Sequence, residues 1–513
     1  MSKGKFTNNV KYLVILICGT LFLSCSYQKD HPNIIYILAD DLGYGELGVY
    51  GQEIIETPHI DALAKAGMRF SQHYSGSPVC APARSVLMTG QHSGHTYIRG
   101  NDEWMERGDT WNYLAMFADP FLEGQRPLAD SIITIAEILK NAGYRTGSVG
   151  KWGLGAPTTD GVPNKQGFDF FYGYNCQRQA HTFYPMHLWK NEERDLLDNK
   201  MVAPHSNLKE GADPSDPASY SDFNLNDYAP ELMHNEAMNF VEKNKDHLFF
   251  LYYASPLPHL PLQAPQRWVN YYHKKLGPEE PYTGKSYFPN RMPRATYAAM
   301  ISYLDEQVGD IVTMLQDLGL YENTFIIFTS DNGPTYTGGA DTRFFDSAKP
   351  FKSEQGWTKG FLHEGGIRVP MIASWPGHIS VNSTSDHLSA FYDVMPTICE
   401  IIGLPIPVQT DGISFLPTLL SNYQEKKHQY LYWEFPAYNG QQAVRLGKWK
   451  GIRKNIFNGN LTIELYDLES DIQEQNNLAT QYLDVVEKIE MILKKEHTPS
   501  TLDKFKIAQL GDK

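Results

Sequence analysis

Apolar runs that end in polar residues constrain the fold of this chain most strongly. Residues 34–39, 248–254 and 324–329 are nearly continuous in apolar side chains, as is typical of parallel strands buried on both faces. A further strand is predicted over 145–149. Helical patterns separate these strands, over residues 59–66, 129–142, 231–244 and 294–318. The alternation predicts an α/β fold with a large mixed, mostly parallel sheet sandwiched by helices.

The pattern changes from about residue 424, where short alternating strands precede a predicted helix over 481–494. We therefore expect a catalytic domain over 31–423 and a smaller α+β C-terminal domain with an antiparallel sheet over 424–513. Within the first domain, about 155–226 is rich in Gly, Pro and Asp and lacks periodicity, which predicts a functional insertion or lid.

Polar residues follow several of the predicted strands, and ligands bind at the carboxyl ends of strands in such sheets. They are Asp40 and Asp41, Lys151, His259, and Asp331 and Asn332. We expect them to meet at one edge of the sheet. The aspartates and Asn332 supply the hard oxygen ligands that Ca²⁺ requires, and three crowded carboxylates would repel one another without a cation. The alternative is that they only cap loops.

The segment SPVCAPARSVLMTG predicts a helix over 80–89, with Pro82 in its first turn and Gly90 as its stop. Cys80 then lies at the start of a helix, which favours thiolates and binds tetrahedral anions. The alternative is a buried, inert cysteine. Arg84 returns to the same face as Cys80. Together with Lys151 and Lys359, it is a candidate to face an anionic ligand.

The first 25 residues are typical of an export signal. An apolar run over 12–23, which is too short to span a bilayer, is preceded by Lys3, Lys5 and Lys11. Leu23-Ser24-Cys25 resembles a lipobox, which predicts cleavage before Cys25 and lipid attachment there. The alternative is a soluble periplasmic product. We therefore expect an exported protein, periplasmic or attached to the outer membrane, that meets membrane only through this anchor.

Composition excludes some partners and scaffolds. A formal net charge of −14 and a pI near 5.6 argue against nucleic acid, which needs basic faces. After the signal, Cys80, Cys176 and Cys399 are the remaining thiols, too few for a disulfide scaffold. A Cys176–Cys399 pair stays open.

Cys80-Ala-Pro-Ala-Arg84 followed by Thr89-Gly90 resembles the signature of the type I sulfatases, the formylglycine-dependent branch of the alkaline phosphatase superfamily. The resemblance covers roughly residues 31–480. Its further motifs are PNIIYILADDLGYGELGVYG, GYRTGSVGKWGLG, FLYYASPLPHLP, TFIIFTSDNG and TKGFLHEGGIRVP. It implies a sulfatase that removes sulfate esters from carbohydrates.

By this resemblance, a maturation enzyme would oxidise Cys80 to formylglycine, whose hydrate is the nucleophile. Calcium would be held at Asp40, Asp41, Asp331 and Asn332, beside residue 80. One hydroxyl of the hydrate would attack sulfur, and the second would then expel sulfate. His259 or Lys359 would protonate the released alcohol, while Arg84, Lys151 and Lys359 would neutralise charge.

Two residues depart from the family pattern. Ala83 stands where many members have Ser, which leaves the core signature intact. Gly153 stands where the family commonly has a histidine that assists sulfate release. We hypothesise that another histidine substitutes, with His181 the first candidate and His92 the second.

Basic and aromatic residues of the insertion are candidates for a sugar subsite, or for ordinary loop packing. They are Arg178, His181, Tyr184, His187 and Trp189. The CQRQAH segment is similar to bacterial glycan sulfatases, which suggests sulfated galactose or N-acetylgalactosamine. Two other functions stay open. One is a phosphatase or phosphonate monoester hydrolase of the same superfamily, and the other is an inactive glycan-binding lipoprotein.

Overall fold

The computed structural model describes residue 1 and residues 31–513. The expected signal segment, including the predicted lipidation site Cys25, lies outside the described residues. Among the residues that are described, no helix combines the length and the apolar composition needed to cross a membrane.

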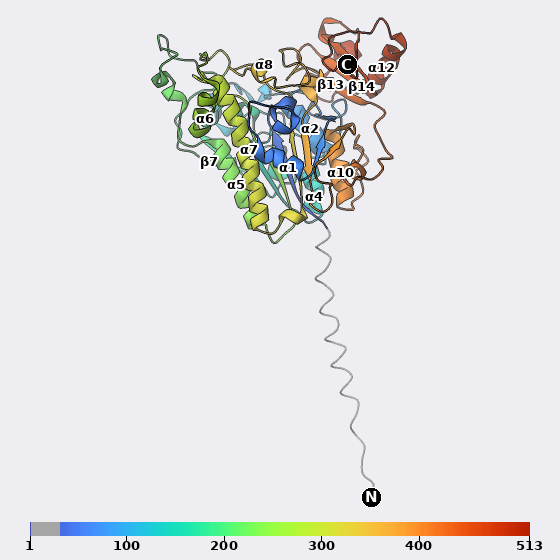
Figure 1. Ribbon diagram of the computed structural model, residues 1–513, viewed down its shortest axis with the longest axis horizontal. Helices are drawn as coiled ribbons and strands as arrows, with labels where there is room; N and C mark the ends of the chain where they lie inside the picture. Colours follow the sequence, from blue (N-terminus) through green and yellow to red (C-terminus); the bar gives the residue numbers. More distant parts are fainter. Residues whose placement is uncertain (2–30) are drawn as a thin grey trace.

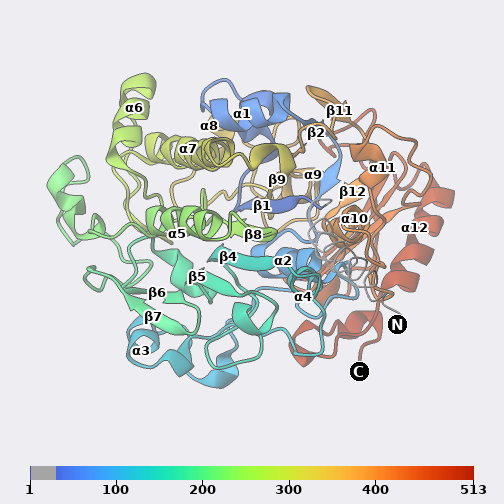
Figure 2. The same ribbon diagram turned by 90° about the horizontal axis from the view of Figure 1, so that it is seen from below.

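The central element is a ten-stranded mixed sheet (Figures 1 and 2). Strands β9, β1, β8, β4 and β5 are mutually parallel, and antiparallel pairs flank them on both sides. In spatial order the strands are β11 (Ser383–Ser385), β2 (Met68–Phe70), β10 (Met371–Ser374), β9 (Thr324–Ser330), β1 (Asn33–Ala39), β8 (Phe249–Ala254), β4 (Arg145–Lys151), β5 (Phe170–Tyr174), β6 (His187–Lys190) and β7 (Glu193–Leu196).

Both faces of the sheet are buried under helices, as Figure 2 shows. Successive residues of β1 alternate between two cores: Ile35 and Ile37 pack on one side, and Ile34 and Leu38 on the other. This two-sided burial explains the continuous apolar runs. One side is covered by α1 (Pro58–Lys65), α5 (Ala229–Lys243), α6 (Gln266–Leu276) and α7 (Pro293–Asp317). The other side is covered by α2 (Cys80–Thr89), α4 (Ile135–Asn141) and α10 (Val394–Ile401).

The C-terminal region forms a separate four-stranded antiparallel sheet, drawn in orange and red in Figure 1. Its helix, α12, packs on it through Val485, Ile489 and Leu493. The elements are β13 (Leu431–Phe435), β14 (Gln441–Leu446), β15 (Trp449–Lys454), β16 (Glu464–Asp467) and α12 (Leu483–Glu496). The predicted fold class is confirmed.

Smaller elements connect these layers. They are β3 (His73–Tyr74) paired with β12 (Ser389–Ala390), and the short helices α3 (Tyr113–Ala118), α8 (Thr342–Phe345), α9 (Glu364–Ile367) and α11 (Leu416–Leu419).

The structure differs from the local sequence predictions at two places. The helix predicted over 129–142 begins only at Ile135, because the Thr134 side chain accepts the Glu137 backbone N–H and Glu137 caps Thr134 in return. Within the segment 155–226, β5, β6 and β7 extend the main sheet, although the sequence there shows no periodicity.

Candidate active site

The order of the strands brings the predicted polar residues together. Asp331 directly follows β9, Asp40 follows the adjacent β1, His259 lies after β8, and Lys151 ends β4. These four strands are neighbours and parallel, so their carboxyl ends form one edge. Backbone bonds fix the junctions, with Asp331 N donating to Ala39 O at 3.0 Å.

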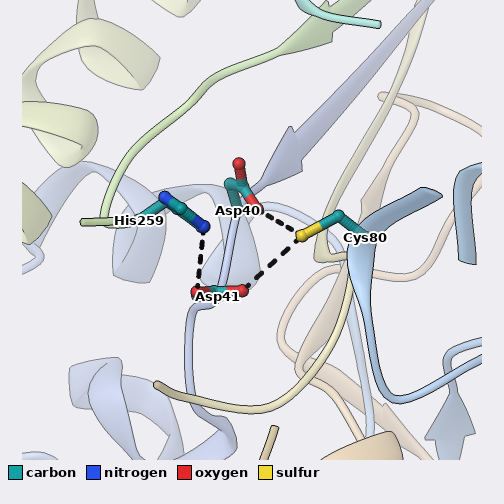
Figure 3. Close-up of side chains that lie close together, drawn as sticks. All are labelled: Asp40, Asp41, Cys80 and His259. Carbon is teal, nitrogen blue, oxygen red and sulfur yellow. Dashed lines mark hydrogen bonds and ion pairs between the residues drawn. The ribbon is translucent and has the colours of Figure 1, made fainter. Parts of the chain in front are cut away.

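Cys80 is the first residue of α2 and faces this edge (Figure 3). Its Sγ lies 3.2 Å from Asp40 Oδ1, 3.9 Å from Asp41 Oδ1 and 3.7 Å from Lys359 Nζ. Gly90 ends the helix in the left-handed conformation, as predicted.

The helix start does not make a thiolate of Cys80. Burial raises the pKa of the thiol well above its usual value, and the Asp40 carboxylate raises it further. Lys151 and Lys359 only partly oppose these effects. Desolvation and a neighbouring negative charge therefore outweigh the helix dipole, contrary to the expectation from sequence.

Each carboxylate of the cluster is paired with a cation. Lys151 Nζ lies 2.6 Å from Asp40 Oδ2, and Lys359 Nζ lies 2.6 Å from Asp41 Oδ2. Arg84 donates to Asp331 Oδ2 from Nη2 at 2.8 Å and from Nε at 3.2 Å. Arg84 is fully buried, so its first role is to compensate Asp331 rather than to face solvent.

The oxygen donors fit a hard cation. Asp40, Asp41, Asp331 and Asn332 are completely buried. Asn332 donates Nδ2–H to Asp41 Oδ1 at 2.7 Å, whereas its Oδ1 has no hydrogen-bond partner. A buried acceptor without a partner among carboxylates is a suitable calcium ligand. Asp41 also has φ +68°, a strained backbone for a non-glycine residue.

His259 and His181 extend the site on one side. His259 Nδ1 lies 2.6 Å from Leu260 O, and because a carbonyl oxygen can only accept, Nδ1 is the donor. The other ring nitrogen, Nε2, lies 3.7 Å from Asp41 Oδ2. The His181 ring stacks on the His259 ring with centroids 5.7 Å apart. His181 Nδ1 also lies 3.1 Å from His205 Nε2. His181 is therefore one ring removed from the carboxylate cluster.

His92 does not reach this site. It follows the far end of α2, whose ten residues span about 15 Å at 1.5 Å per residue. Its Nε2 lies 3.2 Å from Glu496 Oε2. The hypothesis that His92 substitutes for the family histidine is wrong.

Sequence reasoning missed two residues next to Cys80. A Cβ on Gly153 would meet the Gln177 side chain at 3.4 Å. Gln177 Nε2 donates to Asn101 Oδ1 at 2.9 Å, and this oxygen also accepts the Ala81 N–H at 3.1 Å. An amide pair thus occupies the space beside Gly153. In the sequence, the only indication of this amide pair was Gly153 itself, which lacks the side chain that would otherwise fill the space.

The candidate sugar residues have different environments. His187 and Trp189 are buried and contact Glu123 at 2.8 and 2.9 Å, so these two belong to the interior and not to a subsite. Tyr184 packs partly buried against the core. Arg178 lies over the Trp111 ring at 4.7 Å and donates to Trp111 O.

The three described thiols Cys80, Cys176 and Cys399 are free and buried. The pairing of Cys176 with Cys399 that the sequence left open does not occur.

The mostly parallel sheet carries at its carboxyl edge a cysteine that starts a helix and a buried carboxylate cluster, an arrangement that is consistent with an enzyme of the alkaline phosphatase-like superfamily. The sulfatase family model matches residues 32–404, and a model for the C-terminal region of N-sulphoglucosamine sulphohydrolase matches residues 353–499. The chain belongs to the sulfatase family and is a sulfuric ester hydrolase.

Individual relatives agree. Human arylsulfatase A is 32% identical over 444 residues, which cover 82% of this chain and 74% of that protein. Human N-acetylgalactosamine-6-sulfatase is 32% identical over 411 residues, which cover 78% of this chain and 67% of that protein. The crystal structure of Ps i-CgsB matches this chain with a TM-score of 0.71 and 26% identity, over 91% of this chain and 94% of that protein's chain. That protein has also been solved in complex with k-i-k-neocarrahexaose.

Proposed function

We propose that the protein is an exported enzyme that hydrolyses sulfate esters of carbohydrates, with Cys80 converted to formylglycine and Ca²⁺ as cofactor. The position of Cys80 carries the proposal. Its Sγ lies between Asp40 and Lys359 at the start of α2, inside the region that matches the sulfatase family. A maturation enzyme and a sulfated glycan are the partners that this implies.

The donor set supports the cofactor. Asp40, Asp41, Asp331 and Asn332 would hold the calcium, next to residue 80. When bound, calcium would polarise the sulfate group, and the formylglycine hydrate would supply a hydroxyl nucleophile. The unpaired Asn332 Oδ1 is the observation that favours a cation here.

The charges of the cluster suit an anionic substrate. Three carboxylates are balanced by Arg84, Lys151 and Lys359. A divalent cation would therefore leave a local positive charge, which attracts a sulfate ester against the overall charge of −14. Lys359 is the least buried of the three cations, and its side chain reaches Asp41 from outside. In this proposal, His259 or Lys359 would give a proton to the leaving alcohol.

The substrate class rests on the relatives. One acts on N-acetylgalactosamine 6-sulfate, as its name says, and another binds neocarrahexaose. We propose sulfated galactose or N-acetylgalactosamine for this chain, with His181 and Arg178 contacting the sugar. His181 adjoins His259, and Arg178 is fixed by the Trp111 backbone.

The test begins with expression together with a formylglycine-generating enzyme and mass spectrometry of the peptide that contains Cys80. We expect the aldehyde, and sulfate release from an aryl sulfate that Cys80→Ala abolishes. Phosphate release from the matched aryl phosphate should be much slower. Faster phosphate release would instead favour a phosphatase, and an unmodified thiol with glycan affinity but no turnover would favour a binding protein.

A further inference from the structure

A pocket of about 300 Å³ is lined in part by residues that precede and follow Lys359 in the sequence. This volume is at the lower end for small-molecule sites, which span about 300–1,000 Å³, so it fits one sugar unit better than several. The pocket is lined by Gly356, Trp357, Phe361, His363, Tyr438, Gln441, Lys454 and Asn455.

The pocket adjoins the active site through a short stretch of backbone. Lys359 sends its side chain to Asp41, whereas its neighbours Trp357 and Phe361 line the pocket. Consecutive Cα atoms are about 3.8 Å apart, so Phe361 lies within about 8 Å of Lys359 along the chain. The backbone of residues 357–361 thus joins the lysine of the site to the wall of the pocket.

His363 indicates that the pocket is built for a polar ligand. It is 1% exposed, and neither of its ring nitrogens has a hydrogen-bond partner. Trp357 covers the ring at 4.1 Å between centroids. Buried polar groups are normally paired, and an unpaired imidazole in a pocket wall is available to sugar hydroxyls or to a bridging water.

Aromatic rings form the walls. Trp357 and Phe361 are half-buried. Tyr438 is exposed and meets the Phe361 ring edge-on, with ring centroids 5.8 Å apart. Tyr438 has φ +49°, an uncommon backbone for a bulky residue, which places its ring against Gly360. Rings with one apolar face and a polar edge suit a sugar.

Two lysines lie at or beside the pocket. Lys454 lines it and lies 2.8 Å from Glu464, which compensates its charge. Lys352 does not line the pocket, but its Nζ lies 3.9 Å from the centroid of the Trp357 ring, which does. Among the described residues Lys352 has no ion-pair partner, so it is the cation that could meet one anionic group.

We propose that this pocket, which we name the Trp357 pocket, binds a second saccharide unit carrying one anionic group, a sulfate or a carboxylate, of the glycan whose sulfate ester lies at residue 80. The inference rests on the proposed carbohydrate function. It makes the enzyme prefer oligosaccharides to single sulfated sugars.

The first test compares kcat/KM for 6-sulfated N-acetylgalactosamine and for a chondroitin 6-sulfate tetrasaccharide. Tyr438→Ala and Lys352→Gln should each lower the tetrasaccharide value about tenfold, as loss of one stacking or charged contact predicts. The monosaccharide value should change less than about twofold. Tyr423→Ala, at an exposed tyrosine outside the pocket, is the control. Equal effects on both substrates, or on neither, would overturn the proposal.

The second test measures binding of the same tetrasaccharide, and of its desulfated form, to the Cys80→Ala protein by calorimetry. Weaker binding in Tyr438→Ala and Lys352→Gln supports the pocket, and unchanged binding refutes it. The desulfated form shows whether sulfate or carboxylate is the anion. If neither sugar is desulfated by the mature enzyme, the proposed function fails, while this binding measurement still decides the pocket.

Discussion

Glu474 is a buried carboxyl between the two sheets, and we expect its ionisation to cost stability. It is 1% exposed, its Oε2 accepts the Glu364 N–H at 2.8 Å, and its Oε1 has no partner. Burial, together with the nearby Glu364 carboxylate and against the opposing effect of Lys450, raises its pKa from 4.5 to about 8. Although burial also acts on Glu364, Lys450 and Arg368 hold the pKa of that group at about 2.

The folded protein therefore keeps a proton on Glu474 that the unfolded chain releases above pH 4.5. Stability is fully present below that pH and falls as the pH rises toward about 8. The separation of the two pKa values corresponds to at most about 5 kcal/mol at 1.36 kcal/mol per unit. Glu474→Gln cannot ionise and still offers an acceptor to the Glu364 N–H. We therefore expect the free energy of unfolding of the variant not to fall over this pH range.

Urea unfolding of both proteins at pH 5 and pH 9 measures the effect. At pH 5 the free energies of unfolding should agree within about 1 kcal/mol, and at pH 9 the variant should be more stable by several kcal/mol. Glu469→Gln, at an exposed glutamate of the same segment, should show no such difference between the two pH values. An equal shift at both pH values, or destabilisation at pH 9, would refute the reasoning.

Four further changes test the site. Gln441→Leu removes two hydrogen bonds to the backbone beside Lys359 and should lower kcat about tenfold; an unchanged kcat in a folded variant contradicts this. Arg84→Met leaves Asp331 buried without its cation and should cost about 3–5 kcal/mol in urea unfolding, so an unaltered free energy would be decisive against it. His181→Ala should slow single-turnover sulfate release, and normal release excludes His181 as the substitute histidine. Chelation should lower the Tm, with recovery on adding calcium but not magnesium; a Tm that ignores the chelator counts against the metal site.

The strands at the site could be predicted because a strand that is buried on both faces has a nearly continuous run of apolar residues in its own sequence. Residues 34–39 and 324–329 are apolar whichever strand lies beside them, so β1 and β9 were found almost to their ends. Their adjacency is not local information. That Asp331 meets Asp40 follows from the order β9, β1, β8, β4, for which the sequence offers only the general rule about carboxyl edges.

Contacts between distant loops could not be predicted. Gln177 and Asn101 are 76 residues apart, and neither belongs to a periodic pattern. Glu123 shows the same limit, because nothing near it indicates that it would bind His187 and Trp189 in the interior. The sequence predicted a sugar subsite from the aromatic and basic residues of an irregular segment. In the structure, two of these residues, His187 and Trp189, contact the buried carboxylate of Glu123 and are part of the interior.

The boundary predicted near residue 423 separates two kinds of sheet but not two functions. Gln441, at the start of β14, donates Nε2–H to Gly360 O at 2.8 Å and accepts the Leu362 N–H at 3.2 Å. Both backbone groups directly follow Lys359, which reaches Asp41, so the C-terminal sheet holds this segment of the main α/β region in place. The C-terminal sheet thus fixes the Lys359 segment through Gln441 and also forms a wall of the Trp357 pocket.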